Sequence, residues 1–200
     1  MGPVLRSRRL LLRPLVPSDF LAYQEVRRRC AEWLVEWEPR RAAGMPDAAE
    51  NRRAFDARCE AADRERSIGV AYRFGVFLPE RSGAVRFCGE INLGTVQRGA
   101  FQNAYVGYWI DQAVAGQGFM PEAVVATMRF AFEELGLHRV QISIIPRNIA
   151  SRRVVEKLRV RDEGVAERYL EINGVWEDHV RFAVTTEEWA TRATEFAVFL

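Results

Sequence analysis

Apolar and polar residues recur along this chain with two different periods. Over residues 121–135 apolar side chains return every three or four positions, which predicts an amphipathic helix that ends at Gly136. Elsewhere short runs rich in β-branched and aromatic residues predict strands. We expect strands at residues 9–15, 69–78, 85–93, 104–110, 139–145, 167–172 and 175–184, the last two forming a hairpin around Asn173-Gly174.

Helical periodicity marks four further segments. They are residues 20–35, 47–66, 150–158 and 186–193, of which 47–66 is polar, alternates in charge and is expected to be an exposed helix. Strands and helices are mixed along the whole chain, so the pattern predicts an α/β fold. No internal repeat or linker interrupts it, and we therefore expect a single domain over residues 1–200.

Composition narrows the class of protein. The chain has 200 residues, 48% hydrophobic and 28% charged, which is typical of a soluble globular protein. No apolar run approaches the roughly 18 residues of a membrane span, and Met1-Gly2-Pro3-Val4 does not lead into a signal-peptide core. Cys30, Cys59 and Cys88 lack metal-binding spacing. We expect a cytoplasmic protein with reduced thiols and no metal.

Charge is close to balance, at +2 from 29 basic and 27 acidic residues. This does not indicate a nucleic-acid or membrane-surface binder. Lys157 is the only lysine, and the other basic residues are arginines. Two interpretations remain: codon bias in a GC-rich, bacterial type of genome, or many phosphate-binding guanidinium groups. The even spread of the arginines favours codon bias.

The segment with most chemical information is a glycine turn between a strand and a helix. Residues 105–110 are strand-like, Ala115-Gly116-Gln117-Gly118 follows, and Pro121 suits the first helical turn. Unpaired N–H groups at a helix N-terminus make a natural site for phosphate, and glycine lets the backbone approach it. The alternative is an ordinary tight turn, because the spacing matches neither the P-loop nor the dinucleotide-binding fingerprint.

A second element strengthens the phosphate interpretation. Pro146-Arg147-Asn148 ends the next strand, and Asn148 and Ser151 lie near the start of the following helix. Either residue suits a helix cap. The functional alternative places both on a cofactor.

Together these stretches resemble the acetyl-CoA core of the GNAT superfamily of N-acetyltransferases. Within it the chain is similar to the ribosomal-protein N-terminal acetyltransferases of the RimJ and RimL type, and closer to RimJ. The resemblance spans essentially the whole chain and also includes Trp37-Glu38-Pro39, residues 96–101, Gly107-Tyr108-Trp109-Ile110, residues 138–140 and residues 169–179. It implies a mostly antiparallel twisted sheet flanked by helices, with a splayed strand pair that holds acetyl-CoA. The cofactor-binding residues it implies are Tyr108, Trp109, Ile110, Ala115, Gly116, Gln117, Gly118, Phe119, Met120, Asn148 and Ser151.

The chain departs from the superfamily at two places. Ala115 and Met120 replace the arginine or glutamine and the small residue that usually begin and end the turn. Backbone N–H groups make most contacts in such turns, so cofactor binding is still expected. RimL-type enzymes use a glutamate in the late hairpin, but the match falls on Leu170, and Glu171 points to the other face.

The resemblance further implies direct attack of a neutral amine on the thioester. We expect Glu90 to act as general base, Ser151 to protonate or hydrogen-bond the departing thiolate, and Tyr108 to be the alternative acid. Asp178 and His179 are weaker candidates. A splayed pair at Asn92 and Tyr108 is expected to offer an N–H to the oxyanion. The substrate mouth is expected to include Trp37, Glu38, Asn92 and Phe101.

Three functions remain open from the sequence. The first is acetylation of a protein N-terminus, on an alanine- or serine-starting ribosomal protein. The second is acetylation of a small amine such as a polyamine, an amino acid or an antibiotic. The third is a non-catalytic acyl-CoA-binding protein on the same scaffold. The chain is expected to be a monomer or a homodimer.

Overall fold

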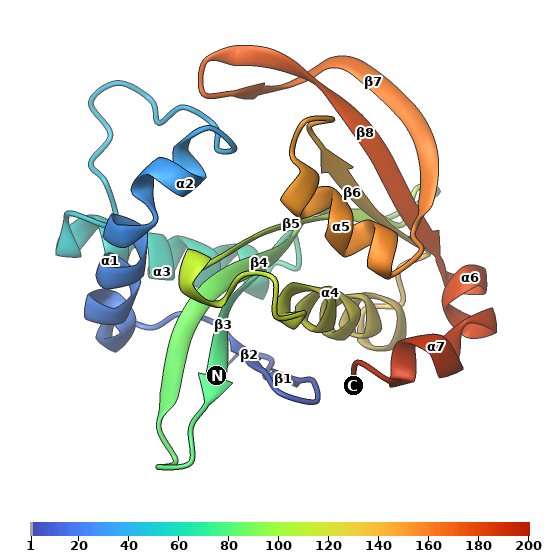
Figure 1. Ribbon diagram of the computed structural model, residues 1–200, viewed down its shortest axis with the longest axis horizontal. Helices are drawn as coiled ribbons and strands as arrows, with labels where there is room; N and C mark the ends of the chain where they lie inside the picture. The colour runs from blue at the N-terminus through green and yellow to red at the C-terminus, as the bar shows by residue number, and fades with distance from the viewer. Residues whose placement is uncertain (1) are drawn as a thin grey trace.

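The computed structural model describes residues 2–200, and its centre is one twisted sheet of eight strands in the order β1-β2-β3-β4-β5-β6-β8-β7 (Figure 1). Neighbouring strands are antiparallel except β5 and β6, which are parallel. The strands are β1 (Leu5–Arg6), β2 (Leu11–Arg13), β3 (Tyr72–Pro79), β4 (Val85–Gln97), β5 (Asn103–Ile110), β6 (Arg139–Ile144), β7 (Arg161–Ile172) and β8 (Val175–Thr185). The expected α/β fold with a mostly antiparallel sheet is confirmed.

Helices cover both faces of this sheet. They are α1 (Phe20–Arg29), α2 (Ala31–Val35), α3 (Arg52–Ser67), α4 (Phe119–Arg129), α5 (Ile149–Lys157), α6 (Thr186–Thr191) and α7 (Ala193–Ala197). Short 3-10 helices lie at Pro17–Asp19 and Gln112–Val114, and α4 continues as a π-helix over Phe130–Glu134. None of the helices in residues 2–200 has the length and apolar character to cross a membrane.

Two hydrophobic cores lie on opposite faces of the sheet. The larger contains Val124 and Val125 of α4 and Val155 of α5, packed on inward-facing residues of the central strands. The smaller lies under α1 and α3, where Phe55 is fully buried against the Tyr23 ring at a centroid distance of 5.0 Å. The alternation along β5 therefore directs Tyr108 to the first core and Trp109 to the second.

Two expected helices differ from the observed ones. The segment 20–35 is broken at Cys30, whose backbone leaves the helical region and whose Sγ contacts Asp111. The segment 47–66 begins as a helix only at Arg52, because Asn51 caps it, and its inner face is buried rather than exposed. The sequence pattern did not predict this buried face because only two residues of α3, Phe55 and Cys59, are buried.

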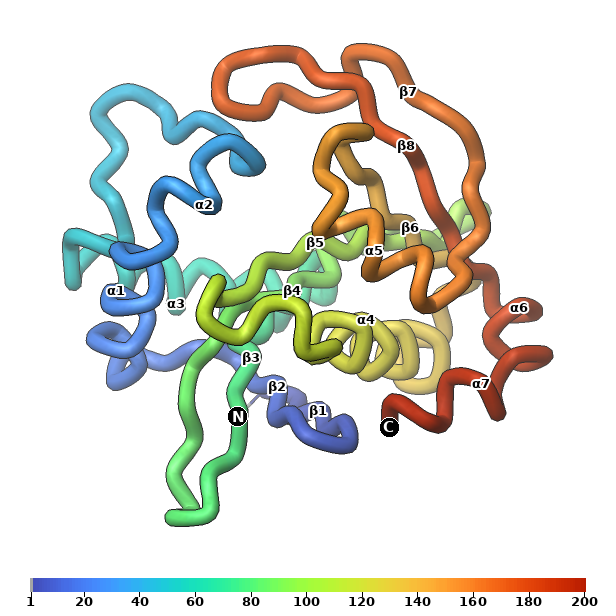
Figure 2. The backbone as a smooth tube through the Cα atoms, in the orientation of Figure 1, coloured from blue at the N-terminus to red at the C-terminus, as the bar shows by residue number. Residues whose placement is uncertain are grey.

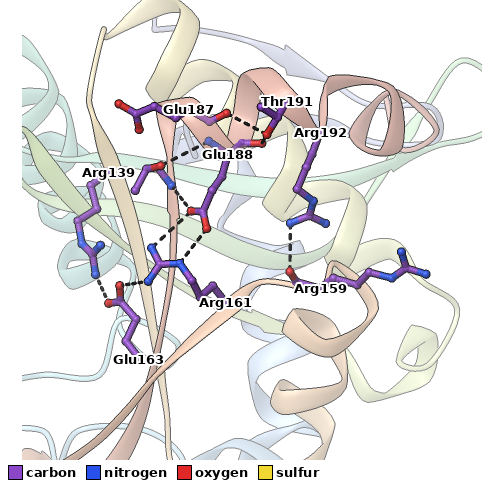
Figure 3. Close-up of polar contacts among 9 residues, drawn as sticks. Arg139, Arg159, Arg161, Glu163, Glu187, Glu188, Thr191 and Arg192 are labelled. Atoms are coloured by element: carbon purple, nitrogen blue, oxygen red, sulfur yellow. Dashed lines mark hydrogen bonds and ion pairs between the residues drawn. The ribbon is translucent and has the colours of Figure 1, made fainter.

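The chain ends are fixed by polar contacts. Arg161 at the start of β7 pairs with Glu163 and with Glu188 of α6, and Glu163 also pairs with Arg139 of β6 (Figure 3). Near the other end, the Arg8 N–H donates to the Phe199 carbonyl at 3.3 Å. The segments near the two ends of the chain are therefore joined to each other.

Candidate active site

The two central strands separate at one end. β5 and β6 pair only where Asn103–Tyr105 faces Arg139–Gln141. Beyond Tyr105 they diverge, and Figure 1 shows β6 leaning away from β5 toward α5. The backbone groups on the two facing edges are therefore left to bond a ligand with peptide-like groups between the strands.

Tyr108 and Ser151 meet across this opening. Tyr108 Oη donates to the Ser151 carbonyl at 3.1 Å, and Ser151 Oγ donates to Tyr108 Oη at 3.1 Å. Burial raises the pKa of Tyr108 above its ordinary value, against the smaller lowering effect of its hydrogen bond with Ser151. The phenol therefore keeps its proton at neutral pH, and in this structure it donates that proton to the Ser151 carbonyl.

Asn148 positions Ser151. Its Oδ1 accepts the Ser151 N–H at 3.0 Å and caps α5. The interpretation of Asn148 as a helix cap is thus confirmed, and the cap fixes the first turn of α5 over the opening.

The glycine turn lies beside the opening, at the start of α4. Gly116 and Gly118 have φ angles of +77° and +80°, which favour glycine, and Gly118 is the N-cap of α4. Gly116 and Gln117 are exposed. The first N–H groups of α4 lack helical partners, so the turn combines free donors with the positive end of a helix dipole.

Asp111 anchors the chain just before this turn. It is fully buried and pairs with Arg29 of α1, while its side chain also accepts the Ala113 N–H at 3.1 Å. Burial raises the pKa of the Asp111 carboxyl, but the bonds from Arg29 and Ala113 outweigh it, so that pKa lies below its ordinary value. The turn is therefore held to α1 by a charged contact that the sequence did not reveal.

Glu90 and Trp109 lie on the opposite face of the sheet from Tyr108, with both oxygens of Glu90 engaged. Arg58 Nη2 lies 2.6 Å from Glu90 Oε1, and Trp109 Nε1 donates to Oε2 at 3.1 Å. Glu90 as a whole residue is 8% exposed. These bonds suit a residue that positions Trp109 and Arg58, and they leave the expected general base with no oxygen free of a donor.

Asn92 differs from its expected surroundings. Strands β4 and β5 stay paired there, and Asn92 Oδ1 accepts the Gly107 N–H at 3.0 Å. The expected splay between Asn92 and Tyr108 is therefore wrong, since the strands that separate are β5 and β6. Because N–H directions alternate along a strand, the Tyr108 N–H points away from β4 and toward the opening.

The segment after α2 borders the same face. Glu38 forms a bidentate pair with Arg27 of α1, with a distance of 2.7 Å from Nη2 to Oε2. The carboxylate expected to meet a substrate cation already has a partner. The Asn173 N–H donates to the Glu38 carbonyl at 2.8 Å, so the tip of the β7–β8 hairpin is joined to this segment (Figure 2).

A shallow hollow of about 370 Å³ lies beneath this junction. Arg147 lines it, pairs with Glu177 at 2.8 Å and places its guanidinium 5.4 Å from the Trp37 ring centroid. Trp37 is therefore close to the candidate mouth. Asp178 accepts the Arg168 N–H and His179 contacts the Glu177 carbonyl, so both have structural partners.

Phe101 is separated from the other candidates. It precedes β5, which begins at Asn103, whereas Tyr108 lies a further five residues along that strand, roughly 16–17 Å at the usual rise per residue. The structure places Phe101 where β5 and β6 are still paired, next to Gln102, whose carbonyl accepts the His138 N–H. It does not bring Phe101 to the opening.

These features fit acetyl-CoA. The exposed glycine turn with the α4 N-terminus suits a pyrophosphate, and no atom lies within 4 Å of the position that a Cβ on Gly116 would occupy. The unpaired edges of β5 and β6 suit the amide groups of a pantetheine chain, which would bring its thioester toward Tyr108 and Ser151.

Comparison with known proteins agrees with this geometry. Residues 9–161 match the family model described as an acetyltransferase (GNAT) domain. The chain is 31% identical over 185 residues to the [ribosomal protein uS5]-alanine N-acetyltransferase of Escherichia coli, a match that covers 92% of each chain. A shorter match, 43% identical over 113 residues, is to the probable N-acetyltransferase YjcK of Bacillus subtilis and spans 56% of this chain and 61% of that protein.

A solved structure gives the same result. RimJ of Mycobacterium smegmatis, in complex with CoA-disulfide, superposes with a TM-score of 0.84 at 30% identity and covers 98% of this chain and 92% of its own. The diverging strands, the glycine turn and the family match together show that this chain belongs to the GNAT family of acetyl-CoA-dependent N-acetyltransferases.

Proposed function

We propose that the acceptor is the α-amine at the N-terminus of a protein, and specifically of a ribosomal protein. The observation that carries this proposal is the similarity to an enzyme named for a ribosomal-protein alanine, which extends over 92% of both chains. Similarity of that extent includes the acceptor side of the fold, residues 37–40 and the β7–β8 hairpin, as well as the cofactor turn.

The geometry of the mouth supports a chain end as acceptor. The bond from the Asn173 N–H to the Glu38 carbonyl joins the hairpin tip to the segment after α2. Glu38 is paired with Arg27, whose guanidinium lies 5.1 Å from the Trp109 ring centroid. An extended peptide terminus is narrow enough to enter beneath this junction, whereas an amine on a broad folded surface is kept away. The exposed Trp176 ring and the Arg147 and Trp37 pair offer contacts to the residues that follow.

Bound acetyl-CoA supplies the acetyl group as a thioester. An α-amine has a pKa of about 8, so an appreciable fraction is neutral near pH 7. After the neutral amine has attacked the thioester carbonyl, the proton that its nitrogen must lose can pass to water in the open mouth. The Tyr108 N–H offers a hydrogen bond to the negative charge that develops on the carbonyl oxygen. Tyr108 Oη then gives its proton to the departing sulfur and is reprotonated from solvent, with Ser151 holding the ring in place.

Glu90 is assigned a positioning role, and Glu90→Gln is expected to lower kcat by less than about 10-fold, because a glutamine still accepts from Trp109. The pH profile of kcat/KM should keep its shape. A loss of about 100-fold or more, together with disappearance of the acidic limb, would return Glu90 to the role of general base.

The proposed function is tested by following thiol release from acetyl-CoA with two sets of acceptors. The first set is peptides whose sequences begin with alanine or serine, each paired with the same peptide blocked at its α-amine. The second is a panel of free polyamines, amino acids and aminoglycosides. We expect release only with the unblocked peptides, and mass spectrometry should locate the acetyl group on the α-amine.

Release with the small amines alone would replace the proposed acceptor and leave the cofactor site as described. Tight binding of acetyl-CoA without release from any acceptor would point to a non-catalytic acyl-CoA-binding protein.

A further inference from the structure

Two cationic side chains from distant parts of the chain meet at the glycine turn. A methyl group built on Gly118 would lie 3.3 Å from Lys157 Nζ and 3.5 Å from Arg9 Nη2. Lys157 ends α5, and Arg9 belongs to the turn between β1 and β2. The side chain at the first position of the glycine turn itself is only the methyl group of Ala115.

Arg9 is held rigidly in this position. Its Nε lies 2.6 Å from Glu122 Oε1, its Nη2 donates to the Gln117 carbonyl at 3.1 Å, and its guanidinium stacks 4.4 Å from the Phe119 ring centroid. Glu122 is 4% exposed, whereas the Arg9 side chain is 39% exposed, so the guanidinium reaches solvent while its carboxylate partner is buried. The Glu122 carboxylate is therefore already paired with Arg9.

Lys157 has no such partner. Within residues 2–200 no carboxylate oxygen lies within 4.0 Å of its ammonium group, and its side chain is exposed. Three sources of positive charge thus converge on the turn, namely Lys157, Arg9 and the N-terminus of α4, against the single charge of Glu122. An uncompensated ammonium beside another cation is unfavourable unless an anion joins them.

We propose that Lys157, with Arg9 beside it, supplies the side-chain charge that holds the pyrophosphate of the cofactor, the contact that Ala115 is too short to make. The compact ammonium acts as a point charge on a phosphate oxygen, and the fixed guanidinium of Arg9 contacts the pyrophosphate from the other side. The proposal concerns binding of the cofactor and does not depend on which amine is acetylated.

The test measures the Kd of CoA by calorimetry for the whole chain and three variants. Lys157→Ala is expected to raise the Kd about 10-fold, as loss of a charge-assisted hydrogen bond does at an accessible site. Lys157→Arg should stay within about 3-fold of the unchanged chain, since it keeps the charge. Arg81→Ala, in the distant β3–β4 turn, removes the same charge and is expected to leave the Kd unchanged.

A second ligand identifies the phosphate. With 3′-dephospho-CoA the loss caused by Lys157→Ala should be the same as with CoA, because both contain the pyrophosphate. A loss confined to CoA would place Lys157 on the ribose phosphate and overturn the assignment. A Kd for Lys157→Ala within 2-fold of the unchanged chain, or a loss matched by Arg81→Ala, would also overturn it.

Chemical protection gives a readout on the unaltered chain. Because Lys157 is the only lysine, an acetylating reagent has one side-chain amine to modify, and the N-terminal α-amine serves as an internal reference. We expect CoA to slow modification of Lys157 and not of the α-amine. Equal rates at Lys157 with and without saturating CoA would contradict the proposal.

Discussion

Replacing Tyr108 by phenylalanine is expected to lower kcat by about 10²- to 10³-fold, the usual contribution of a positioned acid. The ring remains in place, but the proton donor at the opening between β5 and β6 is lost, so the thiolate departs without a proton. Because the hydroxyl faces Ser151 and not the glycine turn, the Kd of CoA should change little. Single-turnover measurement of acetyl transfer with a fixed peptide separates this effect from product release.

Tyr105→Phe is the matched control. Tyr105 lies on the same strand, where β5 and β6 are still paired, and is 45% exposed. It loses the same hydroxyl and should keep full activity. If Tyr108→Phe retained more than about a tenth of kcat while both variants unfolded at the same temperature, the acid would have to be Ser151 or solvent.

Gly89→Ala is expected to destabilise the protein by about 3 kcal/mol, with a fall in Tm of roughly 10 °C. A Cβ on Gly89 would lie 2.3 Å from the Trp109 carbonyl oxygen and 2.9 Å from Ile110 Cα. Both are backbone atoms of the paired strand, so the strands have to move apart. Because β5 carries Tyr108 and leads into the glycine turn, a shift of β5 should also weaken the binding of CoA. Thermal unfolding measures the loss of stability, and calorimetry measures the Kd of CoA.

Gly99→Ala separates backbone strain from steric collision. Gly99 has a φ of +70°, but nothing lies within 4 Å of its Cβ position. We expect it to cost only about 1 kcal/mol and to leave the Kd of CoA unchanged. Equal losses for the two variants would show that β4 and β5 tolerate the collision.

Local chemistry made part of this molecule predictable. The turn at Asn173-Gly174 has φ angles of +48° and +85°, as a two-residue hairpin requires, and Gly136 ends its helix with a φ of +61°. The strand that carries Tyr108 and the helix start that carries Ser151 each had a clear pattern, whereas their place in one site was implied by the resemblance to the GNAT superfamily. The local conformation of a turn or a helix end depends on neighbouring residues, so it can be predicted from the sequence.

Contacts between distant segments were not predictable in this way. Glu90 has a side chain that can act as a base, and it lies on a strand expected to flank the site. Its bonds to Arg58 and Trp109 depend on how α3 packs on β4, which the sequence does not show. Phe101 lay close in sequence to β5, yet at the wrong end of it. Arg9 and Lys157 are separated by most of the chain, and no periodicity relates them.

Helix α1 carries one further consequence. Arg27 binds Glu38 beside the proposed acceptor mouth, and two residues later Arg29 binds Asp111 next to the glycine turn. A small rotation or shift of α1 therefore alters both contacts together. Thermodynamic linkage requires that any acceptor which displaces α1 on binding change the affinity for acetyl-CoA by a given factor, and that acetyl-CoA change the affinity for the acceptor by the same factor.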